Sequence, residues 1–558
     1  MVVALAVLGA TLLAGRWLGL RDSTLEALAF RRLTFRRGRI LSARFAPDGK
    51  TVAYAASWEG APPEIFTVRT DAADSHAIGV AHADILAVSS KGELAVRMRQ
   101  GMINAWPFEP GTLARLPMGG GTPRELLENV VMADWGPNGE DLAVLRRLPN
   151  ARIRLEYPIG SALYEAVPGC DFIRVSPTGD RIACEERAVD SDSGYTISTI
   201  DRKGNKLRLS SGWLSLAGLA WSPRGDGLLF IGGHTVANKA LREVSLSGRE
   251  RVLISNAADL RLDDVGPDGS LLLERLTRRH GMRSLSRGAT AEREIGWLDR
   301  SIVRDISEDG SAVLFTERGE GADSKVGAYL RKTDGSPAIR LGDGEACSLS
   351  SDGRWALSLM TGPPPRELIM YPVGAGLPKK VPVGDVRPIY AFALPKGKGI
   401  FVVSVDEDKM HYSVVGPDGG KARAIPTEGL DIEHTGAVSP DGERFAYGSS
   451  DGKLKLAPIF EGSGSTVPGL VLERNDIVEQ WSVDGRFVYL SRDDELPRPV
   501  DRVELSTGQR RPWRRLMPED STGVYWISQV LISPDGQSYA YSYTAAVASA
   551  LYVVEGVK

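Results

Sequence analysis

The stretch FAPDGKTVAY at residues 45–54 recurs along the chain with small changes. Close copies are VSPTGDRIAC (175–184), WSPRGDGLLF (221–230), VSPDGERFAY (438–447) and ISPDGQSYAY (532–541). Counted by its glycine the unit appears twelve times, and the spacing averages about 44 residues, which is typical of one four-stranded propeller blade. The glycines are Gly49, Gly92, Gly139, Gly179, Gly225, Gly269, Gly310, Gly353, Gly397, Gly442, Gly485 and Gly536.

The repeated Pro-Asp-Gly suits a tight β-hairpin. Pro47 presets φ for the first corner, Asp48 suits the second corner, and Gly49 can take the positive φ that closes the loop. We predict the same structural turn role in the other copies for Pro223, Gly225, Pro440, Asp441, Gly442, Pro534, Asp535 and Gly536. We predict no catalytic, cofactor-binding or metal-binding residue.

Short apolar stretches flank each turn, such as 216–221 before the turn and 227–231 after it. Strands buried on both faces show such near-continuous apolar runs, and blades stacked around an axis bury their strands in this way. We therefore predict an all-β fold of tandem β-propellers with about twelve four-stranded blades. Because one ring usually holds four to eight blades, two six-bladed rings are favoured, while seven plus five or one large ring stay open.

The predicted domains are a first propeller at 31–298 and a second propeller at 299–558. The last unit ends after its third strand, at 551–557, and a spare strand at 30–35 precedes the first hairpin. That strand could complete the last blade, remove an open sheet edge and tie the two rings together.

Residues 1–20, MVVALAVLGATLLAGRWLGL, are apolar or small except for Arg16. No basic segment precedes the run, so we predict a transmembrane helix or anchor rather than a signal peptide, followed by a short linker at 21–30. An N-terminus cut from a longer protein would also explain a helix that starts at Met1.

The composition excludes several classes of protein. The 558 residues are 42% hydrophobic and 25% charged, with a net charge of −3, so neither disorder nor a nucleic-acid partner is indicated. Cys170 and Cys184 could form a disulfide between neighbouring strands, but two buried free thiols are the favoured interpretation. The third cysteine is Cys347.

Motifs for chemistry are missing. The chain contains no G-x-S-x-G nucleophile elbow and no kinase loop or H-R-D motif. None of the six histidines lies at metal-ligand spacing from another histidine or a cysteine, and the calcium-like 190–194 and 406–408 are better interpreted as hairpin tips. We predict no cofactor.

Two basic stretches stand out, at 31–39 and at 510–515. The favoured interpretation is outward-facing arginines whose aliphatic stems pack on a blade. The alternative is attraction to anionic lipid or to an acidic partner.

The unit S-P-D-G-x-x-x-A-[YF] resembles the TolB-type, WD-repeat-like propeller, and residues 439–442 and 533–536 match its turn fully. Four segments further resemble the C-terminal propeller region of bacterial membrane-anchored serine/threonine protein kinases: 31–60, 119–139, 488–510 and 538–556. The resemblance implies the membrane helix and outer propeller of such a receptor, without its kinase domain.

The predicted function is therefore a non-catalytic, membrane-tethered propeller that binds a protein or small ligand at its channel mouths, as the sensor or scaffold part of a kinase-type receptor. A propeller enzyme with a hydrolase or lyase site in the axial channel, and an envelope scaffold, are the alternatives. The resemblance places the propellers in the periplasm or outside the cell. The positive-inside rule, applied to Arg16 and Arg21, leaves the cytoplasmic side open.

Overall fold

The computed structural model describes residues 28–557 except 60, 100–109, 149–151, 167–169, 188–193, 235–237, 258, 319–325, 363–365, 407–408, 426–435, 450 and 474. The regular structure in this part is β, apart from one 3-10 turn, η2 (Pro395–Gly397). The predicted membrane helix at 1–20 lies outside the described residues, as does most of the linker. Among the described residues, no helix has the length and apolar character needed to cross a membrane.

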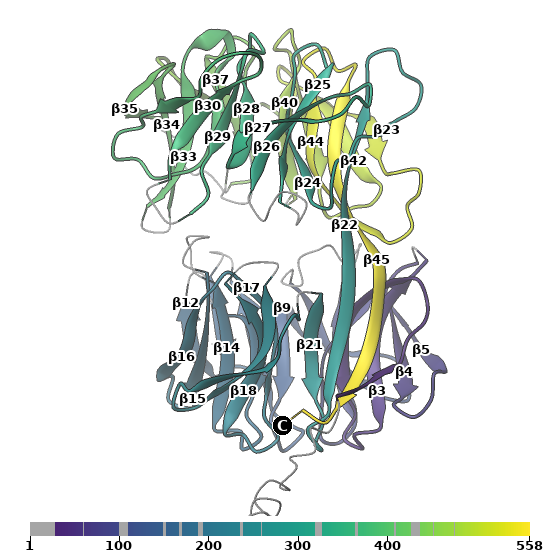
Figure 1. Cartoon of the computed structure of the whole chain (residues 1–558). Helices are drawn as coiled ribbons and strands as arrows, with labels where there is room; N and C mark the ends of the chain where they lie inside the picture. The colour runs from purple at the N-terminus through teal and green to yellow at the C-terminus, as the bar shows by residue number, and fades with distance from the viewer. Residues whose placement is uncertain are drawn as a thin grey trace, which may run out of the picture.

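The strands form two bodies, one above the other, with hairpins at their outer ends (Figure 1). The first body contains β1 (Ala29–Arg32), β2 (Gly38–Phe45), β3 (Thr51–Trp58), β4 (Glu64–Arg69), β5 (Ser75–Ala81), β6 (Ala83–Val88), β7 (Glu93–Met98), β8 (Gly111–Pro117), β9 (Arg124–Trp135), β10 (Leu142–Arg147), β11 (Ile153–Glu156), β12 (Ala162–Ala166), β13 (Cys170–Val175), β14 (Arg181–Arg187), β15 (Tyr195–Asp201), β16 (Lys206–Trp213), β17 (Ser215–Trp221), β18 (Gly227–Gly233), β19 (Lys239–Ser245), β20 (Glu250–Ile254) and β21 (Leu260–Val265).

The second body contains β23 (Arg293–Glu294), β24 (Ser301–Ile306), β25 (Ala312–Glu317), β26 (Gly327–Lys332), β27 (Ile339–Asp343), β28 (Glu345–Leu349), β29 (Trp355–Leu359), β30 (Leu368–Pro372), β31 (Lys379–Val381), β32 (Pro388–Ala393), β33 (Ile400–Asp406), β34 (Lys409–Gly416), β35 (Gly419–Ala424), β36 (Gly436–Val438), β37 (Arg444–Gly448), β38 (Leu454–Pro458), β39 (Ser465–Thr466), β40 (Asp476–Trp481), β41 (Phe487–Arg492), β42 (Arg498–Glu504), β43 (Arg510–Leu516) and β44 (Val524–Ile532). Two long strands, β22 (Leu271–Leu285) and β45 (Tyr539–Glu555), belong to both bodies.

In the described part of the chain, eight sheets each contain four consecutive antiparallel strands in chain order, from β2–β5 to β40–β43. In the first body, the innermost strands β2, β6, β9, β13, β17 and β21 contact one another in this order, and β21 contacts β2. Blades arranged around an axis give this order of contacts. The predicted all-β fold of four-stranded blades is confirmed.

Some strands serve two blades. β9 is the last strand of one blade and the first strand of the next, within a seven-stranded sheet. β22 and β45 pair along their whole length, from Leu271 opposite Val554 to Leu285 opposite Tyr539, and so cross together between the bodies (Figure 1). We call the level of this crossing the seam. The end of β45 pairs with β1, as predicted for an N-terminal strand, but the blade that β1 completes is the last blade of the first body and not the last blade of the chain. The last blade of the chain is completed by the end of β22 and by β23.

The hairpins contain the repeated turn. Gly49, Gly225, Gly442 and Gly536 have φ of 63°, 73°, 76° and 68°. The Ala46 N–H donates to the Thr51 carbonyl, and Asp48 accepts hydrogen bonds from the N–H groups of Lys50 and Thr51. Each turn therefore needs a residue that tolerates the left-handed region.

Valine at position 442 should destabilise the protein. A Cβ there would lie 3.2 Å from Lys398 Cδ, and a β-branched residue would be held at positive φ, so we expect a loss of about 1–3 kcal/mol in the free energy of unfolding. Urea denaturation of Gly442→Val measures it. Gly374→Val is the control, because a Cβ at Gly374 meets nothing within 4 Å. An unchanged midpoint for Gly442→Val would contradict the turn assignment.

The residue five positions before the turn glycine links neighbouring blades. Asp134 Oδ2 accepts the Val175 N–H at 2.7 Å, and Asp305 Oδ2 accepts the Leu349 N–H at 2.7 Å. Asp264 Oδ2 accepts the Phe45 N–H at 2.9 Å, which joins the last blade of the first body to its first blade. The repeat therefore encodes bonds between blades as well as the turn.

Candidate functional site

Two arginines and two aspartates lie between the innermost strands of the first body. Arg44 Nη1 and Arg174 Nη2 both donate to the Asp263 carbonyl, at 2.9 and 2.7 Å. Arg174 also lies 3.7 Å from Asp134 and 3.9 Å from Asp264. Both arginines are buried, and main-chain carbonyls of several blades hold them in place.

In this axial cluster the two positive charges of the arginines are balanced by the two aspartates, and protein groups accept the hydrogen bonds of the guanidinium groups. Burial lowers the pKa of Arg44 to about 10, with a further contribution from Arg174, so the guanidinium stays charged at neutral pH. Burial raises the pKa of Asp134, and Arg174 opposes that rise. We interpret the cluster as a brace across the axis rather than a reactive centre.

A second group of charged residues lies at the end of the β13–β16 sheet opposite its hairpin. Arg187 donates to Asp171 Oδ2 through Nε and Nη2, at 3.2 and 2.9 Å, and its guanidinium carbon lies 5.7 Å from the Tyr195 ring centre. Burial, reinforced by the charge of Asp171, raises the pKa of Glu185 to about 8. Burial also raises the pKa of Asp171, but Arg187 favours its ionised form.

At neutral pH, Glu185 is thus mostly protonated beside a carboxylate that is paired with arginine. A protonated carboxyl group beside an arginine-paired carboxyl group is an arrangement that general acid–base catalysis can use. The hairpin ends of the blades point away from the seam, so this carboxyl pair lies at the end of the first body that faces the second.

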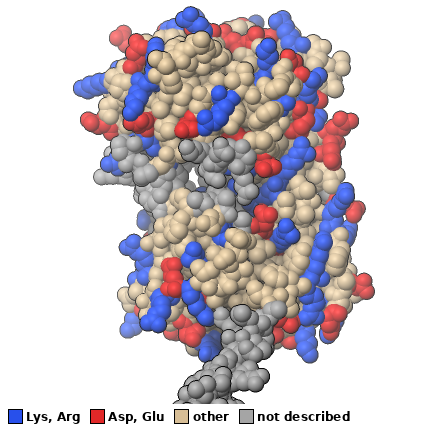
Figure 2. All heavy atoms as spheres, in the orientation of Figure 1, with Lys and Arg blue, Asp and Glu red and all other residues tan. Residues whose placement is uncertain are grey.

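Positive charge gathers at the seam. Lys239 begins β19, Arg278 and His280 lie two residues apart on β22, and Arg300 forms a β-bridge with His280 just before β24. Arg318 donates its N–H to the Arg300 carbonyl at 3.3 Å. In Figure 2, Lys and Arg atoms extend across the right side of the junction between the bodies. We call Lys239, Arg278 and Arg300 the seam cations.

The seam cations form no ion pair within 4.0 Å with any residue that the structure describes, whereas Arg318 pairs with Glu345. Burial, then Arg278 and Arg300, lower the pKa of Lys239 to about 8, and Asp259 partly opposes them. Burial, then Arg300, Arg278 and Arg318, lower the pKa of His280 to about 4. A bound anion would relieve this crowding of like charges.

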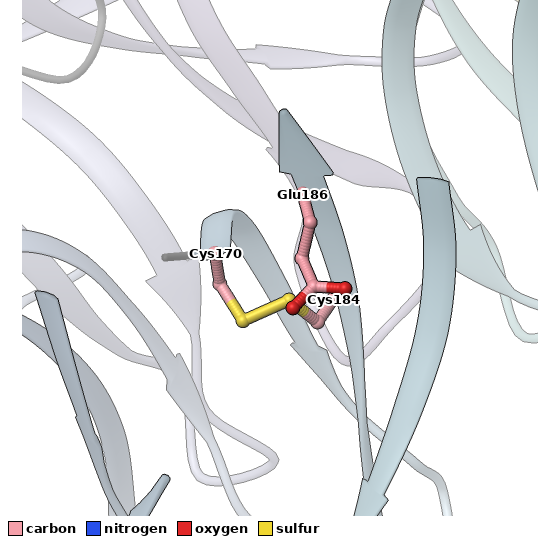
Figure 3. A group of neighbouring side chains, drawn as sticks. All are labelled: Cys170, Cys184 and Glu186. Carbon is pink, nitrogen blue, oxygen red and sulfur yellow. A yellow bond between two sulfur atoms is a disulfide. The ribbon is translucent and has the colours of Figure 1, made fainter. Parts of the chain in front are cut away.

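Cys170 and Cys184 form a disulfide between β13 and β14, so the favoured interpretation of two free thiols is wrong (Figure 3). A β-bulge between Cys170 and Phe172 shifts the register of the strands, and the two Cα atoms lie 5.6 Å apart, within the range for a disulfide. The third cysteine, Cys347, is buried, and burial raises the pKa of its thiol to about 12.

Glu186 lies against the disulfide in Figure 3. Its carboxylate accepts hydrogen bonds from Lys206 Nζ at 2.6 Å, Ser198 Oγ at 3.1 Å and the Tyr164 hydroxyl at 3.2 Å. Its nearest oxygen and the two sulfurs all lie within 4.8 Å of one another.

In the structure, arginines of the two predicted basic stretches form ion pairs and aromatic contacts within the protein. Arg510 donates to Asp476 and Asp501, and Arg31 pairs with Glu555 at 2.7 Å. Arg39 is half-buried against the Tyr525 ring rather than directed outward. The calcium-like 190–194 and 406–408 lie mostly outside the described residues.

Sequence reasoning missed the axial brace, although the repeat itself contains the signal. Counting five residues back from the turn glycines gives Arg44, Asp134, Arg174 and Asp264. The carboxyl pair and the seam cations show no such signal. The carboxyl pair depends on a bulged register, and the seam cations come from three separate segments.

No protein-family model matches this chain, and no curated protein matches it. Solved structures that match this chain include a GH74 xyloglucanase from Xanthomonas campestris (12% identity, 92% of this chain and 99% of that chain, TM-score 0.36). TolB from Acinetobacter baumannii matches with 12% identity over 75% of this chain and 80% of that chain, at a TM-score of 0.23. An oligogalacturonate lyase from Vibrio parahaemolyticus matches with 10% identity over 62% of this chain and 97% of that chain, at a TM-score of 0.31.

TolB proteins are thus among the matches, in agreement with the predicted TolB-type resemblance. With these identities and TM-scores, none of the matched structures assigns an activity to this chain. The resemblance to kinase-linked propellers stays a prediction.

Proposed function

We propose that the chain is a binding protein built from two six-bladed propellers, and that the seam cations bind an anionic group of its ligand. The cyclic contacts of the innermost strands support six blades in the first ring, and β24, β28, β32, β36, β40 and β44 supply six innermost strands for the second. On this proposal the division between the propellers falls within β22 rather than at 298/299, because the end of β22 and β23 join the second propeller, whereas the end of β45 joins the first.

The observation that carries this proposal is the environment of Lys239. Its side chain is half-buried, forms no ion pair with a carboxylate among the described residues, and feels the positive charges of Arg278 and Arg300. Burying such a group without an anion is costly, and a carboxylate or phosphate would offset that cost. The ligand is therefore a protein or small molecule that presents such a group at the seam.

The membrane tether and the receptor role remain part of the proposal. The tether rests on the apolar run at 1–20, and the sensor or scaffold role rests on the resemblance to kinase-linked propellers. On this proposal the propellers lie on the outer side of the membrane, where a ligand would reach the seam.

Substitution at the seam tests the binding role. Titrating the full chain with inorganic pyrophosphate by calorimetry should give saturable binding, and Lys239→Met should weaken it by about tenfold or more, because a charge-assisted contact is lost. Lys203→Met, an exposed lysine at a hairpin, is the matched control and should bind normally. Equal binding by both variants, or no saturable binding by the unaltered chain, would overturn the proposal.

A second candidate function is acid–base catalysis by the carboxyl pair, favoured by the raised pKa of Glu185 and by the hydrogen bonds from Arg187 to Asp171. An enzyme of this kind would lose turnover in Asp171→Asn while keeping pyrophosphate binding at the seam. Lys239→Met therefore tests the binding function, and Asp171→Asn tests the catalytic function without affecting pyrophosphate binding.

A further inference from the structure

We propose that Cys170, Cys184 and Glu186 bind a zinc ion when the disulfide is reduced, so that this blade alternates between a disulfide-linked and a metal-linked state. The site uses none of the seam cations, and it adjoins the carboxyl pair, since Asp171 follows Cys170 and Glu185 lies between Cys184 and Glu186. It lies between the β13–β16 sheet and the neighbouring blade, among the apolar side chains that fill that interface.

The three side chains supply suitable donors in a suitable place. Two thiolates and a carboxylate are ligand types that Zn²⁺ takes in proteins, and three protein ligands leave one position open. Their ligand atoms lie within 4.8 Å of one another, and all three residues come from the paired strands β13 and β14 (Figure 3). After the S–S bond opens, the two sulfurs must move apart to bind one ion, while both cysteines stay on the paired strands.

The charges around the site stay balanced in both states. In the disulfide state, the Glu186 carboxylate is compensated by the Lys206 ammonium 2.6 Å away. In the zinc state, the metal's two positive charges match the two thiolates, and the Glu186–Lys206 pair is unchanged. A buried site therefore gains no net charge on metal binding, which removes the main electrostatic cost of forming it.

Neighbouring groups already hold the Glu186 carboxylate in position beside the two sulfurs. Ser198 Oγ and the Tyr164 hydroxyl donate to its carboxylate, and Lys206 donates as well. Partners of this kind orient ligands in known metal sites, and their loss lowers affinity by about tenfold to hundredfold. The carboxylate needs no rearrangement beyond a small approach to the sulfurs.

The conversion is balanced with a dithiol as the reductant. One thiolate of the dithiol attacks a sulfur of the disulfide, which forms a mixed disulfide and frees one protein thiol. The second thiolate of the dithiol then attacks the mixed disulfide, which frees the other protein thiol and leaves the reductant as a cyclic disulfide. Zn²⁺ then displaces one proton from each thiol, and both protons leave to solvent. Because Cys170 and Cys184 are 2% and 0% exposed, local opening must precede the attack.

The test compares the oxidised and reduced full chain. A phosphine reductant is used and then removed, because dithiols bind zinc themselves, and mass spectrometry verifies the two freed thiols. We expect one additional zinc ion per reduced chain, and Co²⁺ in its place should give a thiolate-to-cobalt absorption band. Equal metal uptake by both forms, or a chain whose β-sheet circular dichroism is lost on reduction and is not restored by zinc, would overturn the proposal.

Variants separate this site from nonspecific thiol binding. Cys170→Ser should abolish the additional zinc, and Glu186→Gln should weaken it by about tenfold or more. Cys347→Ser is the matched control and should leave the stoichiometry unchanged. Glu186→Gln with unaltered affinity would show that the carboxylate is no ligand and would contradict the three-residue site.

Discussion

Leu551→Ala should lower the unfolding midpoint of both bodies together. Leu551 lies on β45 in the first body, is 0% exposed, and packs with Leu33, Ile40 and Leu272. Truncating a buried leucine to alanine costs about 2–5 kcal/mol. Because β45 continues into the second body without a break, we expect this loss to appear in one cooperative transition.

Urea denaturation followed by tryptophan fluorescence, combined with limited proteolysis, measures this coupling. The matched control is Val547→Ala on the same strand, because Val547 is 58% exposed and should tolerate truncation. If Leu551→Ala splits the transition and leaves a protease-resistant second body at the original midpoint, the crossing strands do not couple the two bodies.

The reason for coupling is the register of the crossing strands. β22 and β45 remain paired from Leu271–Val554 to Leu285–Tyr539, with one bulge near Thr277. β22 also pairs with β21 in the first body, and β45 also pairs with β44 in the second. A local opening of either body therefore exposes unpaired backbone at the seam.

The blade architecture could be predicted because its signal is local. A turn such as Pro47-Asp48-Gly49 specifies its own hairpin, and the apolar runs on either side specify buried strands. The pairing of an N-terminal strand with residues 552–555 was also predictable, but its place in the last blade of the first body was not. By contrast, nothing in residues 271–285 distinguishes one long strand shared by two bodies from two short ones.

The candidate sites were less predictable because they depend on register and on distant contacts. The one-residue bulge at Cys170 decides which side chains of β13 and β14 meet, and a bulge leaves little trace in one sequence. The seam cations meet only because β22 crosses between the bodies. Their positions in the sequence, 239, 278 and 300, therefore follow no repeat that could have indicated the cluster.

Glu185→Gln should stabilise the protein at alkaline pH and have little effect at acidic pH. The unfolded chain releases this proton near the ordinary pKa of 4.5, but the folded chain keeps it up to about 8. Between these values the folded state binds more protons than the unfolded state, so the free energy of unfolding falls as pH rises. Glutamine is neutral at every pH and escapes this loss.

The difference in free energy of unfolding between the variant and the unaltered protein should therefore grow above pH 4.5 and become constant above about pH 8. It should reach at most roughly 5 kcal/mol, at 1.36 kcal/mol per pKa unit. Urea denaturation at pH values below, between and above these two pKa values measures it. Glu519→Gln, an exposed residue, should give no pH-dependent gap. A gap of constant size would mean that Glu185 affects packing alone, because only a proton retained by the folded state makes the difference depend on pH.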